Sequence, residues 1–153
     1  MTKKMLIVGG SGGIGREMTE LFKDRYQVFS YGSRDFDITN FRFLERHFHV
    51  NNYDIVLNAS GLNYDSFLHK YDEESMYDIN KVIDVNIKGN INLLANCLPM
   101  MRKNNYGRII LISSVLSSMA VPGTGVYSAT KAFADSLVKT VTVENSSKGI
   151  TCN

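Results

Sequence analysis

The fold of this chain is decided by the stretch Met5-Leu6-Ile7-Val8-Gly9-Gly10-Ser11-Gly12-Gly13-Ile14-Gly15. Its four leading apolar residues predict a short buried strand, and the glycines that follow predict a tight turn. Apolar residues then recur at helical spacing and predict a helix over residues 14–24. Glycines between a strand and a helix let the backbone approach a pyrophosphate, and the free N–H groups at the start of the helix favour negative charge. The stretch therefore indicates a nucleotide-binding turn.

Short apolar strands alternate with amphipathic helices along the rest of the 153 residues. The pattern predicts strands at 27–31, 54–57 and 108–112, helices at 41–49 and 125–147, and a long helix from residue 72 that Gly89 interrupts. Residues 150–152 predict the start of one more strand, and Thr39 is the expected N-cap of the helix at 41–49. This alternation predicts an α/β fold with a doubly wound parallel sheet of the Rossmann type, in three α/β/α layers. No linker divides the chain, so residues 1–153 are expected to form a single domain.

Composition excludes several classes of function. The chain has 17 basic and 15 acidic residues, and its net charge of +2 is too balanced to indicate nucleic acid or an anionic membrane as a partner. Its apolar runs fall well short of the roughly eighteen residues of a membrane span. Cys97 and Cys152 lie far apart in the sequence and are expected to be free thiols in a reducing compartment, which indicates the cytoplasm. The three histidines lack the spacing of metal ligands, so no metal site is expected.

Tyr127 and Lys131 lie four residues apart in a predicted helix. One helical turn places the phenol and the ammonium on the same face, roughly 5–6 Å apart at Cβ. A tyrosine normally ionises near pH ~10, and a fixed cation beside it lowers that pKa. A shift to ~7 needs roughly 4 kcal/mol, which is the order of one Coulomb interaction at ~4 Å and an effective dielectric of ~20. The pair is therefore able to act as a general acid and base at neutral pH, although the same spacing is common on solvent-exposed helix faces.

Five motifs in this chain resemble those of the short-chain dehydrogenase/reductase family, in the family's order and spacing. The family's glycine motif appears as Gly9, Gly13 and Gly15, its Asn-Asn-Ala-Gly motif as Asn58-Ala59-Ser60-Gly61, its mid-helix asparagine as Asn86, its strand-end serine as Ser114, and its Tyr-x-x-x-Lys pair as Tyr127 and Lys131. Ser60 is a departure from the second motif. The resemblance covers essentially the whole chain. It implies an NAD(P)-dependent oxidoreductase that interconverts a ketone and a secondary alcohol.

The resemblance implies catalytic roles for four residues. Ser114 would hydrogen-bond the substrate oxygen, and Tyr127 would give that oxygen a proton or remove one. Lys131 would lower the pKa of Tyr127 and hold the hydroxyls of the nicotinamide ribose. Asn86, in a bent part of its helix, would hold a water that links Lys131 to solvent. Plain structural alternatives exist, because Ser114 can simply end a strand and Asn86 can mark a helix kink.

The same resemblance implies a cofactor site built from several loops. Its expected members are Gly9, Ser11, Gly13, Ile14, Gly15, Arg34, Asp37, Ile38, Asn58, Ala59, Gly61, Tyr127 and Lys131. Arg34, with no acid directly after the second strand, favours the 2′-phosphate of NADP(H) over NAD(H). Against this, Asp35 adjoins Arg34, and Gly12 stands where NADP-using relatives often carry a basic residue. Asp37 would contact the adenine amino group or merely begin a helix, and Asn58 would bind the cofactor or merely tie two strands together.

Two departures from the family pattern concern the fold. Only five residues separate Tyr31 from Asp37, so the usual crossover helix is missing and a third strand is expected to be reduced or absent. The sequence stops at Asn153, before the family's Pro-Gly turn, substrate loop and last strand, so we expect a C-terminally truncated domain, incomplete at that edge. The strand at 108–112 would then expose an unpaired edge.

Two functions remain open at this point. The first is an NADP(H)-dependent oxidoreductase, of which family frequency makes a 3-oxoacyl reductase the leading example. The alternative is a nucleotide-binding module or inactive fragment without turnover. A sugar-nucleotide epimerase would need a large C-terminal lobe.

The expected partners are a small carbonyl or alcohol substrate and further copies of the chain, packed through the helices that carry Asn86 and Tyr127. Five apolar residues would serve that face or the core: Met100, Met101, Phe133, Leu137 and Val141.

Overall fold

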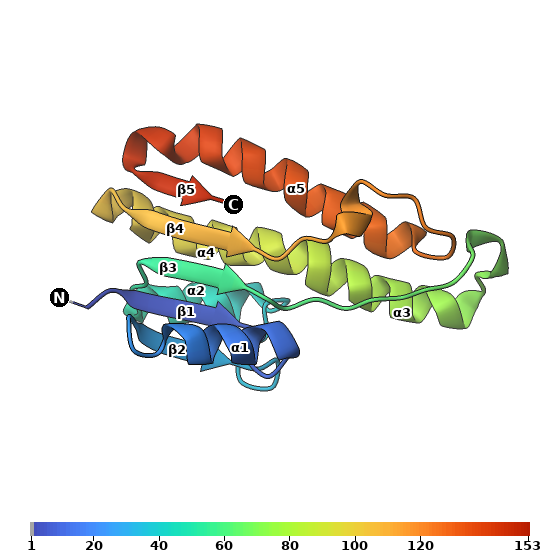
Figure 1. Cartoon of the computed structure of the whole chain (residues 1–153), viewed down its shortest axis with the longest axis horizontal. Coiled ribbons are helices and arrows are strands. Elements are labelled where there is room, and N and C mark those ends of the chain that lie inside the picture. Colours follow the sequence, from blue (N-terminus) through green and yellow to red (C-terminus); the bar gives the residue numbers. More distant parts are fainter. Residues whose placement is uncertain (1) are drawn as a thin grey trace.

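The computed structural model describes residues 2–153, and its centre is a parallel sheet of five strands (Figure 1). The strands are β1 (Lys4–Val8), β2 (Gln27–Tyr31), β3 (Ile55–Asn58), β4 (Gly107–Leu111) and β5 (Ile150–Cys152). Their order across the sheet is β2-β1-β3-β4-β5, so the direction of winding reverses between β1 and β3. In doubly wound sheets, ligands bind at the carboxyl ends of the strands on either side of such a reversal. The predicted Rossmann-type sheet is confirmed.

Helices cover both faces of the sheet, and each face has its own core. The helices are α1 (Gly13–Phe22), α2 (Phe41–Val50), α3 (Glu73–Ile83), α4 (Gly89–Asn104) and α5 (Gly125–Asn145). Met18 and Phe22 of α1 pack on Met5, Ile7 and Leu57 at one face. The larger core, at the other face, is formed with residues of α2, α4 and α5. Alternate residues of the same strands thus serve the two cores, as the two-residue repeat of a strand requires.

The short strand β5 covers an edge that the sequence predicts to be open. Gly107 pairs with Ile150 and Ile109 with Cys152 in a parallel register. Asn153 extends the ladder, because its N–H donates to the Ile109 oxygen at 2.9 Å and its oxygen accepts from Leu111 N at 2.8 Å. Since Ile150 and Cys152 are also buried in the larger core, the prediction of an unpaired edge at 108–112 is wrong.

The segment between β2 and α2 has the compact form that the sequence predicts. Residues 32–40, all described, contain turns but neither a helix nor a strand. The predicted cap of α2 is wrong by one residue: Asn40 Oδ1 accepts from Phe43 N at 3.0 Å. Thr39 does not cap the helix, because its hydroxyl donates to Asp37 Oδ1 at 2.7 Å.

The long helix from residue 72 contains a π turn, Asp84–Lys88, between α3 and α4. Gly89 follows this turn, where a β-carbon would lie 2.5 Å from Ile38 Cδ1. Gly89 therefore allows α4 to approach the loop after β2. Gly89 itself has helical backbone angles, so the irregularity predicted at this residue lies in the π turn directly before it. Together with the first turns of α5, α3 extends beyond the carboxyl ends of the strands (Figure 1). No helix within residues 2–153 is long and apolar enough to cross a bilayer.

Candidate active site

The glycine turn after β1 is shaped by two close backbone approaches. Gly9 has φ +80°, and a β-carbon there would lie 2.6 Å from Ser60 N. A β-carbon on Gly15 would lie 2.2 Å from Gly9 O. Gly13 differs, because its β-carbon position has nothing within 4 Å. Gly9 and Gly15 are thus required by the fold of the turn, whereas Gly13 presents open backbone to any group that approaches it.

A hollow of about 330 Å³ lies at the carboxyl ends of β1 and β3, where the sheet reverses. We call it the glycine-turn hollow. It brings together six residues predicted for the cofactor site from three separate loops: Gly9, Ser11, Asp37, Ile38, Ala59 and Gly61. Apolar side chains of Phe36 and Val85 complete its wall. A concave, mostly apolar site with a few polar groups is the usual form of a small-molecule site.

Seven other predicted cofactor residues lie outside this lining, and three of them, Asn58, Tyr127 and Lys131, are described below. Gly13, Ile14 and Gly15 form the start of α1, where Ile14 is 49% exposed. Arg34 is exposed and lines a separate hollow with Ser11, Gly32, Ser33 and Asp35. Ser11 lines both hollows, so they adjoin at this residue.

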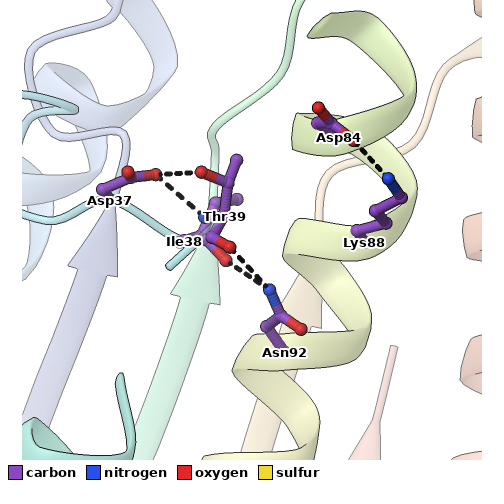
Figure 2. Close-up of polar contacts among 6 residues, drawn as sticks. All are labelled: Asp37, Ile38, Thr39, Asp84, Lys88 and Asn92. Atoms are coloured by element: carbon purple, nitrogen blue, oxygen red, sulfur yellow. Dashed lines mark hydrogen bonds and ion pairs between the residues drawn. The ribbon is translucent and has the colours of Figure 1, made fainter. Parts of the chain in front are cut away.

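Asp37 stands at the wall of the glycine-turn hollow with half of its carboxylate engaged (Figure 2). Its Oδ1 accepts from Thr39 N at 2.9 Å and from the Thr39 hydroxyl. Asn92 of α4 holds the same loop by donating to the main-chain oxygens of Ile38 at 3.0 Å and Thr39 at 3.2 Å. The Asp37 carboxylate is therefore fixed in place, and Oδ2 makes no hydrogen bond within residues 2–153. This oxygen is suited to accept a hydrogen bond from an amino group in the hollow.

A chain of buried asparagine amides links β3 to the π turn. Asn58 Nδ2 donates to Asn90 Oδ1 at 2.8 Å, and Asn90 Nδ2 donates to the main-chain oxygen of Asn86 at 2.7 Å. The Asn90 side chain therefore connects β3 with the π turn. Asn58 thus joins β3 to α4, which is the structural role that the sequence offers as an alternative to cofactor binding.

The side chain of Asn86 joins three elements. Its Oδ1 accepts from Leu62 N at 2.9 Å, and its Nδ2 donates to Leu62 O at 2.8 Å. Nδ2 also donates to the Thr130 hydroxyl at 3.0 Å, and that hydroxyl donates to Tyr127 O at 2.8 Å. Both polar ends of the amide are thus occupied by protein groups. Asn86 fixes the loop after β3 against the helix that carries Tyr127 and Lys131.

Lys131 is buried, with 7% of its surface exposed, and its ammonium lies between strand end and helix. Nζ donates to Ile112 O at 2.7 Å and lies 5.5 Å from the centre of the Tyr127 ring. Burial lowers the pKa of Lys131, and the negative charge of Asp135 opposes that shift. A β-carbon on Gly61 would lie 3.5 Å from both Lys131 Nζ and Asn86 Oδ1. The three predicted residues Gly61, Asn86 and Lys131 therefore meet at one point beside the hollow.

Ser114 lies two residues after Ile112, the residue that directly follows β4 and whose oxygen accepts from Lys131. Its Oγ accepts from Leu116 N at 3.2 Å and caps the short helix η3 (Val115–Ser117). The preceding Ser113 hydroxyl donates to Lys131 O at 3.5 Å. Ser114, Tyr127 and Lys131 thus stand on two connected segments, η3 and the start of α5, that pack together.

Two polar residues of this region are absent from the sequence prediction. Asn90 is buried and completes the amide chain. Asp135 lies one helical turn beyond Lys131, and the nearby hydroxyls of Ser113 and Ser117 lower its pKa. The i, i+4 spacing of Lys131 and Asp135 was visible in the sequence. Asn90 carries no such signal, because its partner Asn58 lies 32 residues earlier in the sequence, on β3.

The structure decides between core and oligomer face for four of the five apolar residues named for both. Met101 and Val141 are buried in the core of this chain, and Met100 and Leu137 pack against it. Core packing, the alternative reading, accounts for these four. Phe133 is half-buried.

Comparison with known proteins agrees with this geometry. A family model described as short chain dehydrogenase matches residues 39–153. A 3-oxoacyl-(acyl-carrier-protein) reductase from Staphylococcus aureus is 31% identical over 181 residues, which cover 100% of this chain and 72% of that relative. A reductase of the same name from Staphylococcus epidermidis is 37% identical over 100 residues, covering 65% of this chain and 40% of the relative. The solved structure of ElxO with NADP bound has a TM-score of 0.85 at 26% identity and covers 98% of this chain and 71% of that one.

The family model spans the greater part of the chain, and its matched region holds Asn86, Ser114, Tyr127 and Lys131. The chain therefore belongs to the short-chain dehydrogenase family of oxidoreductases.

Proposed function

We propose that this protein is an NADP(H)-dependent oxidoreductase that interconverts a ketone and a secondary alcohol, with Tyr127 as the general acid and base. The observation that carries the proposal is the buried Lys131 ammonium, held by Ile112 O within reach of the Tyr127 ring and beside the glycine-turn hollow. When bound, the nicotinamide would supply the hydride. The chain as a whole would act as one nucleotide-binding domain.

Each of four side chains has a distinct task in this scheme. Ser114 donates a hydrogen bond to the substrate oxygen and orients the carbonyl. Tyr127 gives a proton to that oxygen in the reducing direction and removes it in the oxidising direction. Lys131 holds a positive charge beside the phenol, where it stabilises the negative charge that forms on proton transfer. Asn86 holds the loop after β3 and the start of α5 in register through Leu62 and Thr130.

The residues of the first turn and the loops around it fit a dinucleotide. Gly13 leaves its backbone open at the start of α1, where free N–H groups favour a pyrophosphate. Asp37 Oδ2 would accept from the adenine amino group, while Ile38 and Ala59 would supply apolar walls. Arg34 lines the adjoining hollow and would contact a 2′-phosphate, which favours NADP(H). The NADP bound by ElxO is consistent with that preference.

A 3-oxoacyl thioester is the substrate class that the relatives favour. The two curated relatives described above are named 3-oxoacyl-(acyl-carrier-protein) reductases. Exposed apolar side chains rim the loops after β3 and β4: Leu62, Phe67, Leu68, Val115, Met119 and Val121. Such a rim suits a substrate with an apolar chain. We place the reaction in the cytoplasm, where NADPH and reduced thiols coexist.

Self-association would use the exposed faces of the helices that carry Asn86 and Tyr127. Ile91 of α4 and Val143 of α5 are exposed apolar residues on those helices. The core residues Met101 and Val141 have no part in that face. Sedimentation of the purified chain would test this proposal, and a monomer at micromolar concentration would contradict it.

The test of the proposed function is NADPH oxidation across a panel of ketones that includes an acetoacetyl thioester. It is run beside direct titrations with NADPH and NADH. We expect NADPH binding and ketone-dependent oxidation. Binding without turnover for any ketone would favour the alternative, a nucleotide-binding module. Absence of binding to either cofactor would overturn both proposals.

A further inference from the structure

Asn90 is a buried residue of α4 whose side-chain amide makes two hydrogen bonds, and both lead to the candidate site. Only 7% of its surface is exposed. Its Oδ1 accepts from Asn58 Nδ2 at 2.8 Å, and its Nδ2 donates to the main-chain oxygen of Asn86 at 2.7 Å. Asn58 ends β3, and Asn86 lies in the π turn. Asn90 therefore connects the strand that leads to the glycine-turn hollow with the helical turn beside it.

The next member of this chain of hydrogen bonds is Ser60, which departs from the family's motif. Asn58 Oδ1 accepts from Ser60 N at 3.0 Å and also from the Ser60 hydroxyl. Ser60 lines the glycine-turn hollow together with its neighbours Ala59 and Gly61. This wall also lies close to the glycine turn, because a β-carbon on Gly9 would lie 2.6 Å from Ser60 N. A shift of Ser60 would therefore change the shape of the hollow.

The two ends of the chain fix the orientation of both amides between them. The Ser60 N–H at one end can only donate, and the Asn86 main-chain oxygen at the other end can only accept. Asn58 must therefore turn its oxygen to Ser60 and its Nδ2 to Asn90. A reversed Asn90 amide would set its oxygen against the Asn86 oxygen. All donors thus point the same way along the chain, an arrangement in which successive hydrogen bonds strengthen one another.

The loop after β3 is held on both sides of Gly61. Asn58 holds Ser60 before it. Asn86 holds Leu62 after it, through bonds of 2.9 Å to Leu62 N and 2.8 Å to Leu62 O. The buried amide on α4 is bonded to both of these asparagines, so the two attachments share one support. A wall that is already fixed loses little further freedom when a ligand binds against it.

We propose that Asn90 is a positioning residue for the bound cofactor, which holds the wall formed by residues 59–61 in register with the π turn. The proposal rests on the proposed function above, because it concerns the same site. Asn90 itself touches neither cofactor nor substrate, since it is buried and both ends of its amide are engaged by protein groups. It acts on the site through Asn58 and Asn86.

The test compares Asn90→Leu with Asn145→Leu. Asn145 is a matched control, because it too is a buried asparagine whose Nδ2 donates to the oxygen four residues before it, here Val141 O at 2.7 Å. It ends α5, at the opposite end of that helix from Tyr127. Each substitution leaves buried polar partners unsatisfied, so we expect both variants to lose stability. Only Asn90→Leu should raise the Kd for NADPH, by about 3- to 10-fold in a fluorescence titration, as expected for the loss of one hydrogen bond.

A second measurement follows the wall directly and needs neither cofactor nor turnover. Amide hydrogen exchange of Ser60, followed by NMR, reports its bond to Asn58. We expect the exchange of Ser60 to be at least about tenfold faster in Asn90→Leu than in Asn145→Leu. The Phe43 amide, which donates to Asn40 Oδ1 at 3.0 Å, is the internal reference and should exchange equally in the two variants.

Should Asn90→Leu fail to fold, Asn90→Asp takes its place, because its carboxylate still accepts from Asn58 but does not donate to the Asn86 oxygen. The same two changes are expected. Unchanged exchange of Ser60, or an unchanged Kd for NADPH, would overturn the inference. If the wild-type chain binds neither NADPH nor NADH, the proposed function falls, and the exchange of Ser60 alone decides whether Asn90 holds the wall.

Discussion

Lys131 Nζ donates a hydrogen bond to the main-chain oxygen of Ile112 at 2.7 Å, across the boundary between β4 and α5. This contact fixes a helix residue to the end of the strand that leads to Ser114. It also satisfies one of the three N–H groups of a buried ammonium, which would otherwise lose its hydration without compensation. The two remaining N–H groups are left for ligand hydroxyls or water. A single buried cation therefore positions the site and supplies its charge.

Tyr127→Phe tests the proton transfer. The substitution removes the phenol oxygen and keeps the ring beside Lys131, so we expect kcat to fall by about 10²–10⁴ while NADPH affinity is unchanged. Steady-state NADPH oxidation and a fluorescence titration measure the two effects. Tyr26→Phe, in the ring pair with Phe22 on the opposite core, is the control and should retain full activity. Retained turnover in Tyr127→Phe would remove this residue from the acid role.

Arg34→Ala tests the choice of cofactor. Arg34 is exposed and lines the hollow that adjoins the glycine turn, where a 2′-phosphate would extend. Loss of a charge-assisted contact of roughly 1.5–3 kcal/mol should raise the Kd for NADPH about 10- to 100-fold and leave the Kd for NADH nearly unchanged. Arg25→Ala, which also removes an exposed arginine, is the control. An equal loss for both cofactors would reject a phosphate contact for Arg34.

Gly13→Ala and Gly15→Ala form a matched pair on the same turn of α1. A β-carbon at Gly15 would meet Gly9 O at 2.2 Å, so we expect this variant to lose about 3 kcal/mol of unfolding free energy. Gly13 has open space around its β-carbon position, so Gly13→Ala should fold with wild-type stability or slightly better. Urea unfolding measures both. Gly13→Ala should still bind NADPH more weakly, because the added methyl occupies the approach to the backbone. Normal NADPH affinity in Gly13→Ala would place the pyrophosphate elsewhere.

His47 makes the stability of the fold depend on pH. Its Nε2 contacts the Tyr53 hydroxyl at 2.8 Å, and its ring lies 4.9 Å from Phe36, a wall of the glycine-turn hollow. Burial lowers the pKa of His47 below its usual 6.5. The unfolded chain therefore binds the proton more readily, and stability should fall as the pH drops below about 6.5.

The measurement for His47 is urea unfolding at about pH 7.5 and pH 5.5. His47→Gln keeps an acceptor for Tyr53 but does not titrate, so its loss of stability between the two values should be smaller than in the wild type. His49→Gln, an exposed histidine on the same helix, should behave as the wild type does. If His47→Gln and the wild type lose the same free energy on acidification, the buried histidine is not the cause.

Local sequence patterns were sufficient to predict the sheet and most of its helices. The apolar run Met5–Val8, the glycines after it and the i, i+4 pair of Tyr127 and Lys131 depend on short-range spacing, which a sequence displays directly. The compact segment 32–40 was predictable for a similar reason, because a parallel crossover needs more residues than it contains.

Features that depend on tertiary contacts were not predictable. Asn40 rather than Thr39 caps α2, because Asp37 engages the Thr39 hydroxyl. The role of Asn90 depends on its contact with Asn58, 32 residues earlier on β3, which helix spacing alone does not reveal. Residues 150–152 pair along the edge of β4, with Ile150 opposite Gly107 and Cys152 opposite Ile109. The sequence alone does not reveal this register.

The central claim is that a bound nicotinamide lies between Ser114 and Tyr127, with its ribose on Lys131. The most direct measurement is a crystal structure of this chain with NADP. The account predicts the adenosine end beside Arg34 and Asp37, the pyrophosphate on the first turn of α1, and the nicotinamide ring against the Tyr127 hydroxyl. A nicotinamide ring bound away from Tyr127, or a Tyr127 hydroxyl turned out of contact with it, would contradict the account.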